Sequence, residues 1–452
     1  MKVFRYFAAL SLVFFAGSCF AFSQDSEVVA KTKDSKLVLS VSDAIDLALE
    51  KNLSLKESKI TLDAAKREKN YSWNGLSPSL NAKGSLSGPV SDAASGSDTA
   101  SASVSASVSL GLSPSIYTSV RAAAINYEQA QITYENAVRT IELNVRKAYC
   151  SILYEIENVK LQEQNVESAK NQYESNLEKY NRGTLSRLDV LSTQVTYQNS
   201  ALTLENLKVS LENDFASFKQ TLGIPLDTEI ELTGDFNFVR DIKEISIKNF
   251  EVKSSTLASL EKQLEAAQNS LLASRFSAWG PSISAGYSYS YGGLLSNTES
   301  MEGSGSYSLG VSIPLDGYLP WSSGAQSIAN CKDTIEKLQL EIENEKTSLD
   351  LSVKNYLNKI KQYQDSINLR LESINLAQQT YDMTQEAYNY GTKDLLSLQS
   401  ASDNLLSAKL NLMSEEYNLL CAVLELENTL GLPFGTLVNP ENAQSQVKNS
   451  AE

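Results

Sequence analysis

Two kinds of hydrophobic pattern alternate along this chain of 452 residues. Short segments place small apolar residues and serine at alternate positions, as in SASVSASVSLGLS at residues 101–113. Because successive side chains of a strand point to opposite faces, these segments predict strands with one apolar and one neutral polar face. Much longer segments repeat apolar residues at spacings of three and four, which predicts amphipathic helices.

The strand pattern occurs in two pairs, within about residues 78–113 and 281–314. The first pair is joined by the turn-rich SDAASGSD, and serine and glycine fill one face in the clearest strand segments of both pairs. The second pair contains SISAGYSYSY and SYSLGVSI, in which tyrosines and aliphatic residues share a face. We therefore expect four strands in the chain.

A long, proline-free segment follows each strand pair, at about residues 116–180 and 322–387. Its apolar stripe is narrow, as in a coiled coil, and most other positions are polar. A helix of about 65 residues would be on the order of 100 Å long. Such rods exceed an ordinary globular domain and must pack sideways on partners.

The two halves of the chain are copies of one unit. EKYNRGTLSRLDVL at residues 178–191 aligns without gaps with EAYNYGTKDLLSLQ at residues 386–399, and the alignment continues to TLGIP and TLGLP. Gly183 and Gly391 let the backbone leave each long helix. Each copy is expected to run helix, strand, strand, long helix, turn and return helix.

The first residues predict export. Lys2 and Arg5 precede an apolar run and the small-residue segment GSCFA, which is typical of a secretory signal. Cys19 leaves two alternatives open, namely removal with the signal or acylation as a lipoprotein's first residue. No run of 18 apolar residues follows, so no helical anchor is expected.

The expected organisation is a signal peptide at 1–21, a first repeat at 37–227 with its return helix at 186–221, an equatorial connector at 228–256, a second repeat at 257–436 with its return helix at 394–431, and a polar tail at 437–452.

Composition argues against several classes of function. The chain has no histidine, which removes the usual general base and the commonest metal ligand. A net charge of −15 argues against nucleic acid as a partner. Cys150, Cys331 and Cys421 are isolated, so buried apolar cysteines are favoured, although a disulfide between two of them stays open. We expect neither an enzyme nor a bound cofactor or metal.

The alternating strands indicate a shared membrane barrel. A sheet of four strands with one apolar face cannot close on itself, and a membrane does not tolerate open sheet edges. Two chains would give eight strands, whose interior is normally filled, whereas three would give twelve and leave a channel. Small inward-facing serine and glycine favour the wider tube. The predicted fold class is mainly α with a membrane β-barrel that is made by a trimer.

The duplicated order of helices and strands resembles that of the TolC family of outer-membrane efflux proteins over about residues 37–436. The resemblance is carried by the Y-N-x-G-T turns, by LDVL at residues 188–191, and by the TLGIP and TLGLP helix ends. It implies a homotrimer that forms one twelve-stranded barrel in the outer-membrane lipid bilayer, continued as an α-helical tunnel across the periplasm. It also implies a passive exit duct of a tripartite efflux or type I secretion system. The implied partners are a periplasmic adaptor (membrane fusion) protein and an inner-membrane pump of RND or ABC type.

The resemblance also implies site residues at the helical turns. Lys393 stands where the family has an arginine, which keeps the charge but loses the bidentate fork. Ser397 and Ser400 replace an acidic pair, so a cation-binding carboxylate ring is not expected there. Alternatively, Lys393 and Asp189 are ordinary surface charges beside a turn. The implied adaptor-docking tip is Asn181, Arg182, Gly183, Thr184, Leu185, Asn389, Tyr390, Gly391, Thr392 and Lys393, and the implied gate is Asp189, Tyr388, Lys393, Ser397 and Ser400.

Two other classes of protein share some of these features. An adaptor protein also has a long helical hairpin, but it needs only one and has no strand pair inserted in each half. A structural coiled-coil lipoprotein would explain the long helices and Cys19. It leaves the alternating strands unexplained, so the duct is the favoured hypothesis.

Overall fold

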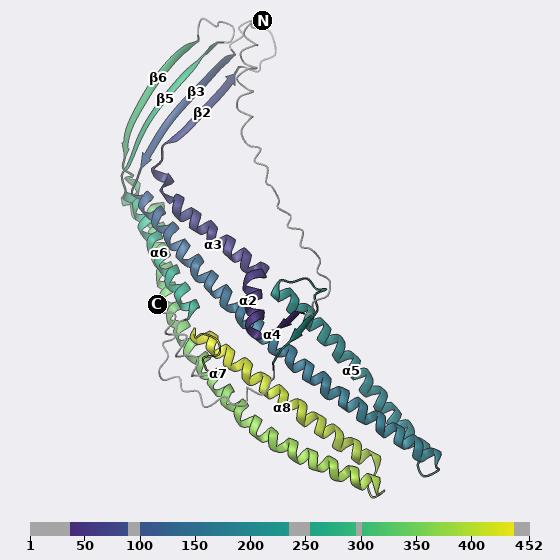
Figure 1. The fold of residues 1–452 in the computed structure, drawn as a ribbon. Coiled ribbons are helices and arrows are strands. Elements are labelled where there is room, and N and C mark those ends of the chain that lie inside the picture. The colour runs from purple at the N-terminus through teal and green to yellow at the C-terminus, as the bar shows by residue number, and fades with distance from the viewer. Residues whose placement is uncertain (1–36, 89–99, 235–253, 295–300, 438–452) are drawn as a thin grey trace, which may run out of the picture.

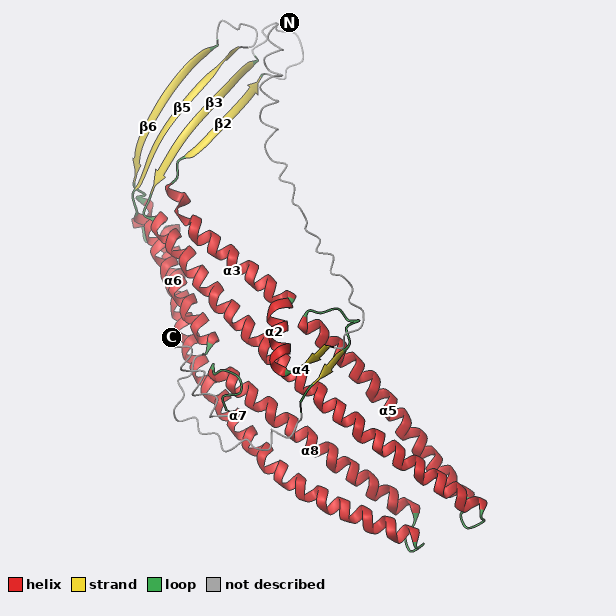
Figure 2. Cartoon of the chain, viewed as in Figure 1, coloured by secondary structure: helices red, strands yellow, loops and turns green. Residues whose placement is uncertain are grey.

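The computed structural model describes residues 37–88, 100–234, 254–294 and 301–437. The expected signal peptide with Cys19, most of the expected connector and nearly all of the polar tail lie outside the described residues. The described chain is elongated, with a four-stranded sheet at one end and stacked helices along the rest (Figure 1). Strands and helices are thus segregated along the long axis (Figure 2).

The first repeat follows the predicted order. Its long helix has 67 residues, close to the length expected from the sequence. The elements are β1 (Leu37–Leu39), α2 (Val41–Lys51), α3 (Leu53–Tyr71), a 3-10 turn (Ser72–Leu76), β2 (Ser79–Ser87), β3 (Ser101–Leu112), α4 (Ser115–Asn181), α5 (Arg187–Leu222) and β4 (Ile230–Leu232).

The second repeat has the same plan, which confirms the predicted duplication of helix, strand, strand, long helix and return helix. Its long helix again has 67 residues. The elements are α6 (Ser255–Trp279), β5 (Ser282–Leu294), β6 (Glu302–Ser312), a 3-10 turn (Asp316–Tyr318), α7 (Ser323–Asn389) and α8 (Leu395–Leu430).

The helices form two successive layers of four, and α4 and α7 run through both (Figure 1). Near the sheet, the packing order is α3, α4, α6 and α7. In the far half, the order is α5, α4, α8 and α7. One edge of the molecule is therefore made by α3 and α5 in succession, and the other edge by α7.

Two hydrophobic clusters hold the middle of the molecule, where the return helices end. In the first repeat, Tyr149 and Phe218 are almost fully buried between α4 and α5 and contact edge-to-face at 6.3 Å. In the second, Val423, Leu426 and Leu430 of α8 are fully buried against α4 and α7. Burial of a large side chain contributes about 1.5–3 kcal/mol, so these clusters anchor both return helices.

Two features of the first repeat are not predicted by its periodicity. β1 and β4 pair in parallel, and the buried Tyr149 hydroxyl donates to the Leu39 carbonyl at 3.0 Å. Asn52 separates α2 from α3, and its side-chain amide donates to the Thr221 carbonyl at 2.7 Å. Gly223 ends α5 at φ 72°, where a Cβ would lie 2.6 Å from the Lys51 carbonyl oxygen. The glycine of TLGIP is therefore required both by its backbone conformation and by close packing.

The described helices include none that is both long and apolar enough to cross a bilayer.

Candidate functional site: the two helical turns and the exposed sheet

The two turns at the far end of the molecule are closed in the same way. Gly183 and Gly391 adopt φ 76° and 72°, respectively, which is the left-handed conformation that glycine favours. The Thr184 amide donates to the Lys179 carbonyl at 3.0 Å, and the Thr392 amide donates to the Ala387 carbonyl at 2.9 Å. These bonds satisfy carbonyls that each helix end leaves free. The repeated Y-N-x-G-T motif thus builds two matching tips.

The helices that follow the turns have side-chain caps. Ser186 accepts a hydrogen bond from the Asp189 amide at 3.2 Å, and its hydroxyl donates to the Asp189 carboxylate at 2.7 Å. Asp394 accepts from the Ser397 amide at 3.0 Å, and hydrogen bonds from Ser397 lower the pKa of the Asp394 carboxyl. Two of the implied gate residues, Asp189 and Ser397, therefore also stabilise helix N-termini.

Most of the implied docking residues are exposed. Only Leu185 among them is partly buried. Arg182 forms an ion pair with Glu178 one turn earlier, whereas Lys393 is exposed on the second turn. Within the described chain, Lys393 and Asp189 form no ion pair with each other. The tips thus offer two adjacent polar turns of similar shape, one carrying Arg182 and the other Lys393.

Tyr388 joins the two hairpins just behind the tips. Its hydroxyl donates to the Asn176 side-chain oxygen of α4 at 2.9 Å, and the Gln172 amide donates to the same oxygen at 3.2 Å. The Lys179 ammonium lies 5.1 Å from the centre of the Tyr388 ring. Burial raises the pKa of the Tyr388 hydroxyl, so the hydroxyl stays a protonated donor at neutral pH.

Asn176 is fully buried, and its amide nitrogen has no hydrogen-bond partner in the described structure. Nothing in the sequence analysis singled this residue out. No sequence signal distinguishes it, because α4 carries many Asn and Gln side chains in the same region. A second bond between the hairpins lies farther along, where the Gln399 amide donates to the Thr196 hydroxyl at 2.8 Å. Tyr388 is therefore brought into an interhelical contact, while Ser400 stays exposed.

The sheet at the other end has the order β2, β3, β5, β6, and all three pairings are antiparallel. Its register places the serines of neighbouring strands opposite one another, as in Ser85 with Ser103 and Ser288 with Ser306. These hydroxyl pairs lie 2.7 Å and 2.8 Å apart. One face is therefore a ladder of small polar side chains, as the alternation predicted.

The opposite face of the sheet is apolar and uncovered. Leu80, Tyr307 and Leu309 keep 75%, 89% and 78% of their surface exposed. No described helix packs across either face, and the outer edges of β2 and β6 have no strand partner within the described chain. In water the apolar face of this sheet would be exposed, and in an apolar environment its two open edges would leave backbone groups unpaired. The sheet of a single chain therefore needs further elements or copies to cover it.

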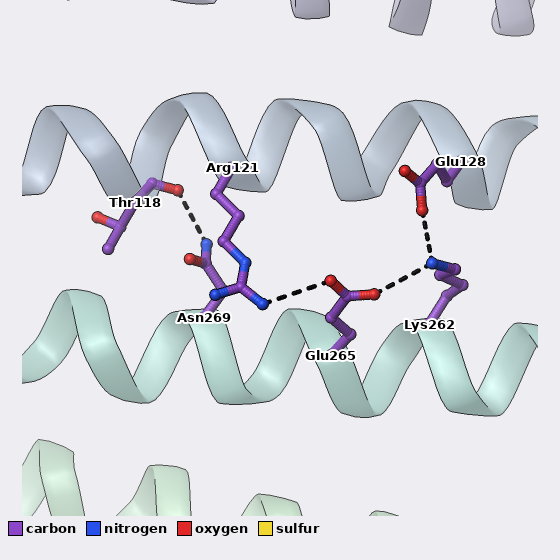
Figure 3. A network of polar contacts seen from close by, with 6 residues as sticks. All are labelled: Thr118, Arg121, Glu128, Lys262, Glu265 and Asn269. Carbon is purple, nitrogen blue, oxygen red and sulfur yellow. Dashed lines mark hydrogen bonds and ion pairs between the residues drawn. The ribbon is translucent and has the colours of Figure 1, made fainter.

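A polar network ties α4 to α6 in the helical layer nearer the sheet (Figure 3). The Lys262 ammonium contacts Glu128 at 2.5 Å and Glu265 at 3.1 Å, and Glu265 contacts Arg121 at 3.4 Å. The buried Asn269 amide donates to the Thr118 carbonyl at 2.8 Å. The charges alternate in sign from Arg121 through Glu265 and Lys262 to Glu128, and two of the three contacts join α4 to α6.

The described residues contain no group of three or more His, Cys, Asp or Glu side chains placed to hold a metal ion. Cys150, Cys331 and Cys421 are present as free thiols, and burial raises the pKa of Cys150 to about 12. A thiol with so high a pKa is a poor nucleophile at neutral pH.

Comparison with known proteins finds one family match in each of the two repeats. The model of the family described as outer membrane efflux protein matches residues 44–224 and 247–432. No curated protein matches the chain.

Several solved structures with a similar fold are outer-membrane proteins. The CmeC outer membrane channel of Campylobacter jejuni matches with a TM-score of 0.71 and 17% identity, over 86% of this chain and 85% of that one. The outer membrane protein VceC of Vibrio cholerae matches with a TM-score of 0.68 and 14% identity, over 87% and 96%. The MtrE outer membrane channel of Neisseria gonorrhoeae, in its open state, matches with a TM-score of 0.61 and 19% identity, over 87% and 89%. At these identities the likeness concerns the fold.

Proposed function

We propose that this chain, which belongs to the outer membrane efflux protein family and is a component of an outer-membrane efflux channel, serves as the passive exit duct of a tripartite efflux or type I secretion system. Three copies form one twelve-stranded barrel in the outer membrane, continued by a helical tunnel in the periplasm. A periplasmic adaptor protein connects the duct to an inner-membrane pump of RND or ABC type, and the pump supplies the energy.

The observation that carries this proposal is the four-stranded sheet with a bare apolar face, a serine face and two open edges. Unpaired backbone groups cost several kcal/mol each in lipid, so the edges of β2 and β6 must be paired in a membrane. If β6 of one copy pairs with β2 of the next, three copies close a ring of twelve strands. The apolar face then meets lipid, and the serines line a lumen wide enough to conduct.

The helical half supports the same assembly. Leu188, Val195, Leu202 and Val209 are exposed along α5 and recur every seven residues. α7 carries the exposed Leu369, Leu376 and Met383 at the same spacing. Because α5 and α7 lie at opposite edges of the four-helix layer that is farther from the sheet, neither stripe can cover the other within one chain. Copies arranged head to tail in a ring cover both stripes, as in a coiled-coil seam.

The exposed turns at residues 181–185 and 389–393 are proposed as the surface that docks the adaptor. Their position at the end farthest from the sheet supports this assignment, since that end would lie deepest in the periplasm (Figure 1). We assign the gate to Tyr388 and Asp189 with Lys393, Ser397 and Ser400. The Tyr388 contact with Asn176 supports this part, because it joins two hairpins that would have to separate for the tunnel to widen.

The first test is the mass of the detergent-extracted assembly from the outer-membrane fraction, followed by conductance in planar bilayers. We expect about three times the 49.5 kDa chain, less any signal peptide, and a discrete conductance from that species. A soluble monomer would mean that the strands face a protein core, and the duct would have to be abandoned. A trimer that never conducts, even after its tips are removed by proteolysis, would contradict the open lumen.

A further inference from the structure

The serine face of the sheet carries two charged side chains among the described strands, Lys83 on β2 and Glu302 on β6. The strand register places both on the same face as the serine ladder, since Lys83 is opposite Ser105 and Glu302 is opposite Gly292. β3 and β5 contribute only neutral residues to this face. The proposed lumen is thus almost uncharged, and its two charges occupy definite positions.

Lys83 lies in the middle of its strand. It is the fifth of the nine residues of β2, and its row across the sheet continues through Ser105, Ser290 and Ser304. Its neighbours in sequence, Ala82 and Gly84, belong to the apolar face. Lys83 is exposed and has no ion pair within the ranges that the structure describes. Small hydroxyl groups in the same row leave its long side chain free to reach into the lumen.

Glu302 is distant from Lys83 within one chain. It begins β6, near the end of the sheet remote from the helices, whereas Lys83 is on the opposite edge strand. Three strand spacings separate the two edges, or about 14 Å. Glu302 can therefore approach only the Lys83 of a neighbouring copy, so the lysine is not neutralised by its own chain.

We propose that Lys83 from each copy forms a ring of positive charge halfway along the barrel lumen and that this ring favours anionic solutes over cationic ones. The inference rests on the proposed function, because the ring exists only in a barrel shared by several copies. The rest of the Lys83 row is serine, and the second charge of this face, Glu302, lies one row farther from the helices on the opposite edge strand.

The effect has a defined range. The screening length is about 10 Å in 0.1 M salt and about 3 Å in 1 M salt. A lysine on the wall of a twelve-stranded barrel therefore acts on ions across much of the lumen in dilute salt, and a low-dielectric wall strengthens its field. In concentrated salt the effect should almost disappear.

A competing explanation is that Lys83 only protects an exposed strand edge. Lysine on an edge strand discourages pairing with other chains, and β2 is an edge strand of this sheet. In that case, Lys83→Gln would change how readily copies assemble and would leave ion permeation unchanged. The two explanations therefore differ in what they predict for the purified trimer.

The test is the reversal potential of the purified trimer in planar bilayers under a KCl gradient. In dilute salt we expect Lys83→Gln to lower the chloride-to-potassium permeability ratio about twofold or more, and Lys83→Glu to lower it further. Lys83→Arg keeps the charge and should behave as the wild type. The differences should shrink at about 1 M KCl because of screening. Glu302→Gln should leave the ratio unchanged or raise it. Equal ratios for all Lys83 variants would overturn the proposal.

A second measurement covers the case in which closed tips suppress the current. Isolated outer membranes are treated with a membrane-impermeant amine reagent, and modification of Lys83 is measured by peptide mass spectrometry. We expect Lys83 to be modified and tripolyphosphate, used as a multivalent anion probe, to slow the reaction relative to the exposed Lys346 of α7. An unmodified Lys83, or one that the anion does not protect, contradicts the ring. Absence of the trimer itself would instead contradict the proposed function.

Discussion

At the scale of single residues, the contact between Tyr388 and Asn176 joins the two hairpins near their tips. Asn176 is fully buried and already has one amide nitrogen without a partner. Its oxygen accepts from Tyr388 on the other hairpin and from Gln172 on its own helix. A buried polar group of this kind is costly when it loses a partner, which makes the pair sensitive to small changes.

Tyr388→Phe should therefore loosen the tips. The change removes one hydrogen bond to Asn176 and keeps the ring that packs near Leu395 and Leu398. We expect a loss of about 1 kcal/mol in the contact between hairpins. If that contact closes the tunnel, the open fraction in planar bilayers should rise about fivefold. Tyr390→Phe is the matched control, because Tyr390 is 83% exposed. Equal currents for both variants would show that Tyr388 does not hold the tips together.

Sequence reasoning identified Tyr388 but not its partner. The tyrosine lies in a motif next to a glycine turn, which a duplicated pattern makes visible. Asn176 lies inside a helix rich in Asn and Gln, where composition does not distinguish a buried amide from a solvated one. Ser186 and Asp394, which cap the following helices, can be recognised in the sequence as polar residues just after each turn, whereas their bonds to Asp189 and Ser397 depend on where each helix begins. Their part in a gate stays a prediction.

At the scale of elements, the network between α4 and α6 predicts a defined pH dependence. The hydrogen bond from Lys262 lowers the pKa of Glu265, so its stabilisation is present above the carboxyl's unfolded pKa and is lost as pH falls through the lowered value. Hydrogen bonds to Glu128 and Glu265 raise the pKa of Lys262. That stabilisation is present below the amine's unfolded pKa and is lost as pH rises through the raised value. The network is complete between about pH 5 and pH 10.

Lys262→Met should lower thermal stability most within that pH window. The expected loss is at most about 1 kcal/mol, because the groups are partly exposed. Unfolding followed by circular dichroism in detergent, at pH 3 and pH 7.5 and at low and high salt, measures the effect. The difference from wild type should shrink at pH 3 and in about 1 M salt. Lys346→Met, at an exposed position of α7, should show no such dependence. A loss of thermal stability that does not depend on pH or salt would mean that Lys262 contributes by packing instead.

The long elements could be predicted because their patterns are sustained over many residues. Alternation defined all four strands of the sheet, and the narrow apolar stripes defined α4 and α7. β1 and β4 were missed, because three residues each give no period to detect. The break between α2 and α3 was also missed, because it depends on Asn52 reaching the end of α5, a contact between positions far apart in sequence.

At the scale of the whole molecule, the two exposed heptad stripes determine how copies fit together. The α5 stripe runs from Leu188 to Val209, a separation of 21 residue steps or about 31 Å of helix, and begins next to the tips. On α7, Leu376 lies at nearly the same distance from the tips as Leu202 does on α5. In a head-to-tail ring, these two residues should therefore meet between neighbouring copies.

Leu202→Glu should weaken the assembly, since it places an unpaired carboxylate in an apolar seam that is repeated at every interface. Adding Leu376→Lys should restore much of it, because the new charges meet. Light scattering in detergent over a concentration series measures both, with an expected shift of at least about tenfold in the dissociation midpoint. Leu340→Lys is the control for Leu376→Lys, because Leu340 is also exposed on α7 but lies near the sheet. Combined with Leu202→Glu, it should not restore the assembly. Since α5 and α7 occupy opposite edges of one chain, rescue by Leu376→Lys can arise only between copies. Failure of that rescue, with a trimer still formed by the wild type, would place the α5 stripe against a different helix.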